Sequence, residues 1–258
     1  MTKTLIRVIS VAGSARRDTF HRPPVGVEWE FFDASTGLAE GFEYDLDVAW
    51  AHIKRALAPG EIGCYCSHVR AWQALLADPT ADQILVVEDD VYVDWPVTLH
   101  LTEVDWASKG VHFLKFFGRF PAKFHVAEKN YPIWDRHVVQ YQTQQFGTQI
   151  YLLTRHAAER FVRNFRRISR PIDVEMERPW ATGIPVAGIV PPTALELSVP
   201  SSVVDRRADR EPTHLESARY YGGRVIERIR GRVYRTAGPR VKINGRDRSQ
   251  SVFDYRNQ

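Results

Sequence analysis

Three consecutive carboxylates, Glu88, Asp89 and Asp90, follow directly after the apolar run Ile84–Val87. An unbroken run of branched apolar residues is typical of a strand buried on both faces, as in a parallel sheet covered by helices. Because an unpaired carboxylate is costly to bury, the three acids must lie where this strand leaves the sheet. Ligands of open α/β sheets bind at that carboxyl edge, so the sequence predicts a site there.

The alternation of side chains along a strand places Glu88 and Asp90 on one side and Asp89 on the other. Two carboxylates on one side repel each other unless a positive charge lies between them. Carboxylate oxygens are suited to a hard divalent cation such as Mn²⁺ or Mg²⁺. The pattern therefore indicates a divalent-cation site. The alternative is a solvent-exposed strand end whose acids cap the next helix.

The composition indicates a globular protein with a sizeable core, since 44% of the 258 residues are hydrophobic and 26% are charged. One large domain, or one domain with an appendage, is expected from this length. Cys64 and Cys66 would point to different faces of a predicted helix, which disfavours a disulfide between them and a thiol metal site. Residues 1–7 resemble no signal peptide and no apolar run approaches about 20 residues, so we expect a cytoplasmic protein.

The charge is concentrated at one end of the chain. Residues 205–258 contain fourteen Arg or Lys and seven Asp or Glu, whereas the whole chain has a net charge of +4. We therefore divide the chain into a main domain, residues 1–204, and a basic C-terminal extension, residues 205–258. Such an extension could contact anionic lipid, a phosphorylated ligand or nucleic acid, and a solvated tail is the alternative. A short basic amphipathic helix is expected over residues 220–230.

The rest of the chain alternates apolar runs with helical patterns, which predicts an α/β fold. A helix over residues 48–58 is expected to end at Pro59 and Gly60, and residues 119–137 are expected to form a long loop. Residues 95–104 are expected to form a connecting segment. The predicted strands cover residues 5–11, 26–34, 84–91, 111–117, 138–141, 149–153 and 184–190, and further helices cover residues 61–76 and 155–162.

Two features beside the predicted strands could bind a ligand. The first strand leads through Ser10 into a small-residue turn and then Arg16 and Arg17, an arrangement common at phosphate and nucleotide sites. It lacks the spaced glycines of a dinucleotide motif. Glu61 is expected at the N-terminus of the 61–76 helix, and His68 could either contact the ligand or pack in the core.

A second acidic cluster lies in residues 171–177. Asp173 and Glu175 share a face if this segment is extended, whereas Asp173 and Glu177 share one if it is helical. These acids are either a second reactive group, separate from the strand-end cluster, or acids that stabilise a helix N-terminus.

Several of these segments together resemble a known family. Gly60–Cys64, Ser67 with His68, Trp72 and the apolar strand that leads into Glu88–Asp90 resemble the bacterial lipopolysaccharide glycosyltransferases of family 25. The segments Gly147–Arg155 and Pro171–Asp173 are similar to two further blocks of that family, and the opening strand with Arg16 and Arg17 is similar to its start. The resemblance runs from about Ile6 to Pro200, with departures at Tyr65, Cys66 and Gln149.

The resemblance implies a GT-A-like fold, that is, a Rossmann-type mixed sheet flanked by helices. It also implies an inverting transfer from a nucleotide-sugar donor, often UDP-galactose, to a hydroxyl group of a glycan or lipid-linked oligosaccharide. A divalent cation, Mn²⁺ or Mg²⁺, would neutralise the charge that gathers on the departing nucleotide diphosphate. Peripheral contact with a membrane through the basic extension is a further expectation.

With this chemistry, Asp90 is expected to ligate the cation directly, Glu88 to be a second ligand or a ribose contact, and Asp89 to orient the site. Asp173 is the first candidate for the general base that takes the proton of the acceptor, ahead of Glu175 and then His68. The residues expected to bind the donor are Ser10, Arg16, Arg17, Glu61, His68, Glu88, Asp89, Gly147 and Thr148.

Other classes of function remain open on the sequence alone. A metal-dependent nucleotidyltransferase or phosphohydrolase could use the same strand-end acids. A non-catalytic nucleotide-binding or nucleic-acid-binding module could use the basic extension. Nucleic acid is the less expected partner, because the extension has few aromatic residues among its arginines for stacking on bases.

Overall fold

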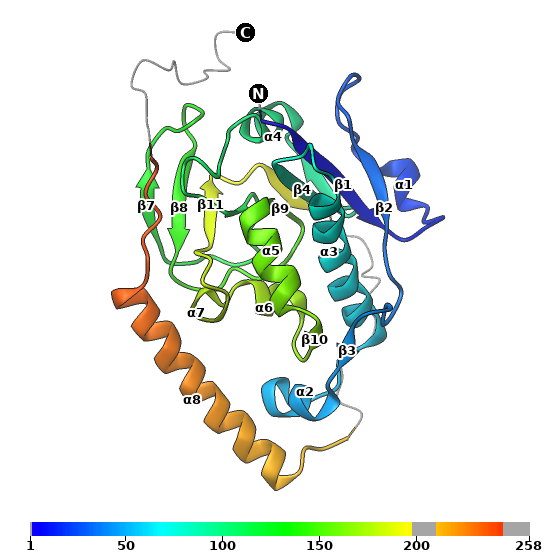
Figure 1. Ribbon diagram of the computed structural model, residues 1–258, viewed down its shortest axis with the longest axis vertical. Coiled ribbons are helices and arrows are strands. Elements are labelled where there is room, and N and C mark those ends of the chain that lie inside the picture. The colour runs from blue at the N-terminus through cyan, green and yellow to red at the C-terminus, as the bar shows by residue number, and fades with distance from the viewer. Residues whose placement is uncertain (1, 198–209, 245–258) are drawn as a thin grey trace.

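The computed structural model describes residues 2–197 and 210–244, and its centre is an eight-stranded mixed sheet (Figure 1). In spatial order its strands are β2 (Glu30–Asp33), β1 (Thr4–Ser10), β4 (Gln83–Glu88), β9 (Ile150–Thr154), β6 (Phe113–Lys115), β11 (Ala187–Val190), β8 (His137–Tyr141) and β7 (Phe124–Glu128). Two small sheets pair β3 (Glu43–Tyr44) with β10 (Arg167–Ile168) and β5 (Val91–Val93) with β12 (Ala194–Glu196). The predicted Rossmann-type mixed sheet flanked by helices is confirmed.

The strand that carries the acids, β4, lies inside the sheet, as its apolar sequence predicts. It pairs in parallel with β1, with Ile9 opposite Glu88, and antiparallel with β9, with Val87 opposite Ile150. The sheet around β4 is therefore mixed rather than purely parallel. Because β1 and β4 run the same way, their carboxyl ends, Ser10 and Glu88, come to one edge of the sheet.

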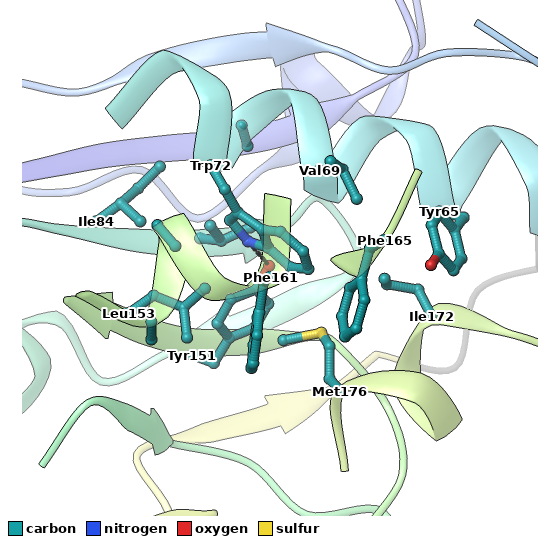
Figure 2. Close-up of a cluster of buried hydrophobic side chains, with 14 of the residues drawn as sticks. Tyr65, Val69, Trp72, Ile84, Tyr151, Leu153, Phe161, Phe165, Ile172 and Met176 are labelled. Atoms are coloured by element: carbon teal, nitrogen blue, oxygen red, sulfur yellow. Dashed lines mark hydrogen bonds between the residues drawn. The ribbon is translucent and has the colours of Figure 1, made fainter. Parts of the chain in front are cut away.

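Helices cover both faces of the sheet. One face packs against α3 (Pro59–Ala77), α5 (Arg155–Asn164) and α6 (Ile172–Met176), where Trp72 and Phe161 lie over Tyr151 and Leu153 (Figure 2). The other face packs against α4 (Trp95–Thr102), through Trp95 and its neighbours. The remaining helices are α1 (Arg16–Thr19), α2 (Leu46–Ile53), α7 (Pro179–Thr182) and α8 (His214–Ala237).

The predicted helix boundary at Pro59 and Gly60 was wrong. Helix α2 already ends at Ile53, where Lys54 takes a left-handed conformation with φ of 59°. Pro59 instead begins α3, because the first position of a helix needs no backbone N–H and suits the fixed φ of proline. Glu61 lies in the first turn of α3, as predicted, and accepts a hydrogen bond from the Ala58 N–H at 3.0 Å.

Two other segments have more structure than the sequence predicted. The connecting segment 95–104 is mostly helix α4. Asp94 caps the start of this helix, where its side chain accepts a hydrogen bond from the Val97 N–H at 3.4 Å. The loop 119–137 contains the edge strand β7, which pairs antiparallel with β8. Its residues are largely exposed, so it lacks the alternating apolar pattern by which a half-buried strand is recognised.

Helix α8 is longer than the expected helix over residues 220–230, and it is docked on the rest of the chain. It contacts α2 and α7, and Glu227 accepts hydrogen bonds from Nε and Nη2 of Arg178, each at 2.8 Å, and from the Trp180 indole at 2.9 Å. Arg178 also binds Glu175 at 2.8 Å. The predicted boundary between residues 204 and 205 lies outside the described residues. None of the helices in the described ranges has the length and apolar character that crossing a membrane requires.

Arg178→Ala is expected to destabilise the protein by about 3–5 kcal/mol, because it removes the cation that binds both oxygens of the partly buried Glu227 and one of the two arginines beside Glu175. Arg230→Ala is the matched control, since Arg230 is exposed and lies 3.8 Å from Glu227, and its cost should stay below about 0.5 kcal/mol. Urea unfolding and proteolysis of α8 measure both effects. Equal losses for the two variants would show that Arg178 does not hold α8.

Candidate functional site

The carboxyl ends of β1 and β4 open into a cavity of about 960 Å³. The start of α3, the loop before β9, the start of α6 and the end of β12 complete its walls. This volume is at the upper end of the range typical of small-molecule sites and is large enough for a nucleotide sugar. Most of the predicted site residues line it, namely Ser10, Arg16, Glu61, His68, Glu88, Asp89, Asp90, Gly147, Thr148 and Asp173.

Glu88 is held in place by two groups from other elements. The Thr148 hydroxyl donates a hydrogen bond to its Oε1, and His68 Nε2 lies 3.4 Å from the same oxygen. Burial raises the pKa of Glu88, but His68 and the Thr148 hydroxyl outweigh burial and hold that pKa below its usual value. Glu88 is therefore a carboxylate at neutral pH and is available as a ligand for a cation.

Asp89 and Asp90 have different surroundings. Asp89 accepts hydrogen bonds from the Ser10 hydroxyl at 2.6 Å and from Arg16 Nη1 at 3.2 Å. Asp90 is 3.8 Å from Arg16, and its buried Oδ1 accepts no hydrogen bond from the described residues. Burial raises the pKa of Asp90 to about 7, and the charges of Glu88 and Asp89 act in the same direction. Arg16 therefore offsets only part of the unfavourable environment of the Asp90 carboxylate.

His68 is part of a buried chain of polar groups. The Trp72 indole donates to the Tyr151 hydroxyl at 2.8 Å, and that hydroxyl lies 2.8 Å from His68 Nδ1 (Figure 2 shows the first of these bonds). When the hydroxyl donates its own proton to Nδ1, the remaining proton of a neutral His68 lies on Nε2, the atom that is 3.4 Å from Glu88 Oε1. His68 is therefore both packed in the core and in contact with the site.

Cys64, His68 and Glu88 also form a group that could hold a metal ion, since one potential ligand atom of each lies within 4.8 Å of the others. Burial, and next the charge of Glu88, raise the pKa of the Cys64 thiol well above its usual value. A protonated thiol is a poor ligand, and a hard cation prefers oxygen. Glu88 and the unsatisfied oxygen of Asp90 suit Mn²⁺ or Mg²⁺ better.

Asp173 lines the cavity from the first turn of α6. Its two oxygens accept hydrogen bonds from the Gly147 N–H at 3.1 Å and the Val174 N–H at 2.8 Å. Gly147 has φ of 76°, and a β-carbon there would lie 2.1 Å from the Gln149 side-chain oxygen, so glycine is required. Glu175 does not line the cavity; it is paired with Arg170 and Arg178.

A buried ion pair that the sequence analysis missed fixes the loop before β9. Lys115 Nζ donates to the carbonyl oxygens of Phe146 at 2.8 Å and Gly147 at 2.9 Å, and it also binds Glu177. The other oxygen of Glu177 accepts the Phe146 N–H at 3.1 Å. The helical alternative for residues 171–177 was correct, since most of this segment forms α6. Asp173 and Glu177 both accept hydrogen bonds from the loop before β9. The signal was a lysine inside the apolar run of residues 111–117.

The two arginines after β1 have separate environments. Arg16 lines the cavity, whereas Arg17 does not. Arg17 donates to the Ser10 carbonyl oxygen at 2.9 Å and pairs with Asp33, so it joins the ends of β1 and β2. Glu61 lines the cavity too, but Arg55 holds its carboxylate, with one bond of 2.7 Å.

The short strand β12 adds groups that the sequence did not indicate. It pairs with β5, directly after the acids, and the Leu197 N–H donates to the Asp90 carbonyl oxygen at 2.8 Å. Glu196 pairs with Arg119 and accepts from the Gln149 amide at 3.1 Å. Glu196, Gln149 and Arg119 therefore border the cavity beside Asp90.

The lining of the cavity is acidic among the described residues. Three arginines, Arg16, Arg55 and Arg119, face six carboxylates. The six are Glu61, Glu88, Asp89, Asp90, Asp173 and Glu196. A ligand for such a cavity must either be cationic or bring a cation with it.

Comparison with known proteins shows the family. Residues 3–176, more than half of the chain, match glycosyltransferase family 25, described as LPS biosynthesis proteins. The chain belongs to glycosyltransferase family 25. The matching part contains the acidic groups of the cavity described above, namely Glu88 to Asp90 and Asp173, and also the Gly147–Thr148 loop. The prediction from the sequence motifs is thereby confirmed.

Individual relatives add less. A Haemophilus influenzae protein described as a candidate glycosyltransferase is 28% identical over 156 residues, which are 58% of this chain and 52% of that protein. The chain thus spans about half the length of the curated relative it matches. The crystal structure of A197 from STIV covers 83% of this chain and all of its own, with 10% identity and a TM-score of 0.35, a likeness too low to support an argument.

Asp90→Asn is expected to stabilise this family 25 protein at high pH without a cation. The pKa of Asp90 is about 7 in the folded state and near 3.8 when unfolded, so folding disfavours the charged form and stability falls as pH rises through this window. At pH 8 in EDTA the gain should be at most about 4 kcal/mol, and at pH 4 it should vanish. Thermal unfolding at the two pH values measures it.

Asp89→Asn is the control for this prediction, because Asp89 accepts hydrogen bonds from Ser10 and Arg16. It should destabilise the protein at pH 8. If Asp90→Asn also destabilised the protein at pH 8, the carboxylate of Asp90 would have a partner that satisfies it.

Lys115→Met should cost about 3–5 kcal/mol, because it leaves Glu177 charged and buried. Adding Glu177→Gln should restore at least half of that loss, since no unpaired charge then remains. Arg167→Met, at the largely exposed pair with Asp45, should cost below about 1 kcal/mol. Urea unfolding of the variants tests this, and a double variant no better than Lys115→Met would refute the pairing as the cause.

Proposed function

We propose that the chain transfers a sugar from a nucleotide-sugar donor to a hydroxyl group of a glycan or lipid-linked oligosaccharide, with inversion at the sugar. UDP-galactose is the first donor to test. The observation that carries the proposal is that two acidic groups from different elements line one cavity in a family 25 chain: Glu88 to Asp90 at the end of β4, and Asp173 at the start of α6.

The residues at the strand end suit a hard divalent cation. Asp90 has a buried oxygen without a hydrogen-bond partner among the described residues, and Glu88 is held as a carboxylate beside it. These two side chains would hold Mn²⁺ or Mg²⁺, which when bound supplies positive charge for a departing nucleotide diphosphate. This ion also accounts for how an anionic donor could enter an acidic cavity.

The residues around the cation would bind and orient the donor. Arg16 reaches the acids from the turn after β1 and has a guanidinium group that suits phosphate oxygens. Asp89 binds Arg16, and the Ser10 hydroxyl binds Asp89. Ser10 and Asp89 would therefore orient Arg16 rather than take part in the reaction. The Gly147–Thr148 loop, which Lys115 and Glu177 hold, positions Glu88 through the Thr148 hydroxyl.

Asp173 is the proposed general base. Two backbone N–H groups fix its carboxylate toward the cavity, and it is separate from the strand-end acids. In an inverting transfer, such a carboxylate takes the proton of the acceptor hydroxyl while that oxygen attacks the sugar from the face opposite the leaving group. Glu175, the second candidate, is paired with two arginines away from the cavity, which supports Asp173 instead.

Thermal unfolding with nucleotides and nucleotide sugars, each with Mn²⁺, with Mg²⁺ and with EDTA, tests the proposed donor site. A ligand that binds only the folded state raises the melting temperature by mass action. We expect UDP and a UDP-sugar to stabilise the protein only with the cation, and Asp90→Asn to abolish the effect. Asp47→Asn, at an exposed acid of α2, should leave it unchanged.

Asp173→Asn separates the base from the binding site. It should lower kcat by at least about a hundredfold, as expected for loss of a general base, and leave the stabilisation by the nucleotide unchanged. Transfer is followed by release of the nucleotide and by analysis of the glycosylated product. If kcat and donor binding fell together, Asp173 would bind the donor instead. Release of free sugar with no acceptor product would favour a hydrolase.

A further inference from the structure

Helix α8 presents an apolar face that no other part of the described chain covers. Its side chains are half exposed or more, between 50% and 60%. We call them the outer stripe: Leu215, Val225, Ile226, Ile229 and Val233. Isolated exposed apolar residues need no explanation, but a contiguous row along one helix indicates a surface that binds something.

The spacing of the outer stripe follows the helical repeat. Ile226, Ile229 and Val233 are separated by three and four residues, which places them on one side of α8. The opposite side is the docked one, where Glu227 binds Arg178 and Gly231 is buried against Trp180. The helix thus has an inner face that packs on the protein and an outer face that is apolar. Figure 1 shows α8 lying along one edge of the molecule.

The flanks of the outer stripe are positively charged. Helix α8 contains six arginines and two glutamates. Both glutamates are neutralised from outside the helix, Glu216 by Arg210 at 2.6 Å and Glu227 by Arg178 at 2.8 Å. The six arginines are Arg219, Arg224, Arg228, Arg230, Arg232 and Arg235.

We propose that the outer stripe of α8 binds the surface of an anionic phospholipid bilayer, with the helix lying in the plane of the membrane. Apolar side chains flanked by arginines are what such an interface requires, because the chains enter the boundary region while the guanidinium groups meet lipid phosphates. From Leu215 to Val233 the outer stripe runs about 27 Å along α8. A second copy is the poorer occupant, since pairing two identical stripes would bring arginine-rich flanks together.

This surface is connected to the proposed active site. Glu227 of α8 binds Arg178, which binds Glu175 in α6, the helix that carries Asp173. A membrane at α8 would therefore lie next to the element that holds the proposed base. Binding of the bilayer does not depend on the proposed function, whereas delivery of a lipid-linked acceptor to Asp173 does rest on it.

Co-sedimentation of the full chain with lipid vesicles tests the proposal. Vesicles of phosphatidylcholine alone are compared with vesicles containing phosphatidylglycerol, at low and at high salt. We expect binding to the anionic vesicles only, weakened by salt because the charge contribution is screened. Ile229→Ser with Val233→Ser should weaken binding at least about tenfold, and so should Arg228→Glu with Arg232→Glu.

The matched control removes exposed apolar side chains elsewhere. Val25→Ser with Leu38→Ser, at residues that are 106% and 53% exposed, should bind vesicles like the wild type. No binding to anionic vesicles, or equal binding by the stripe variant and the wild type, would overturn the proposal. A dimer in solution that the stripe variant dissolves would assign the face to a second copy and overturn it as well.

The same variants separate this inference from the proposed function. The stripe variant should keep the stabilisation by UDP with Mn²⁺, because none of the outer-stripe residues lines the cavity. Vesicle binding by a protein that responds to no nucleotide would refute the proposed function alone. A response to nucleotide without vesicle binding would refute the membrane surface alone.

Discussion

The repulsion among carboxylates at the end of a buried strand is the constraint on which the site depends. The apolar residues of β4 can be covered on both faces only if its acids leave the sheet together, and their charges then lie close to one another. Neighbouring groups satisfy part of this charge: Arg16 and Ser10 at Asp89, and Thr148 and His68 at Glu88. Asp90 keeps a raised pKa, because burial and its two acidic neighbours outweigh the charge of Arg16.

The loop before β9, which also lines the cavity, is held by charged groups as well. The loop before β9 contains residues with φ above zero, Phe146 and Gly147, and would not hold its shape alone. The ion pair of Lys115 and Glu177 fixes it from inside the core, and Asp173 fixes it from α6. This loop thus binds both acidic groups, since Thr148 donates to Glu88 and the Gly147 N–H donates to Asp173. Buried contacts to the loop therefore help to set the separation between Glu88 and Asp173.

Much of this arrangement could be predicted from the sequence because local patterns report it. Burial of single elements explains the apolar run before Glu88 and the apolar face of α3. The acids at the start of α6 are a local feature of a helix N-terminus. What could not be predicted depends on where other side chains and strands lie in space. Glu175 and Asp173 are equivalent in spacing, and only the positions of Arg170 and Arg178 separate the paired one from the one facing the cavity. Likewise, Glu196 reaches the site through the pairing of β12 with β5.

The central claim is that Glu88 and Asp90 hold a divalent cation that binds the nucleotide diphosphate. Electron paramagnetic resonance of Mn²⁺ tests it directly, since the signal of the free aqueous ion decreases when the ion binds. Titration with UDP present, compared with the same titration of UDP without protein, should show one further Mn²⁺ bound per chain in the wild type, and none in Glu88→Gln or Asp90→Asn. A wild-type titration that matches UDP alone, or variants that bind the further Mn²⁺ like the wild type, would contradict the account.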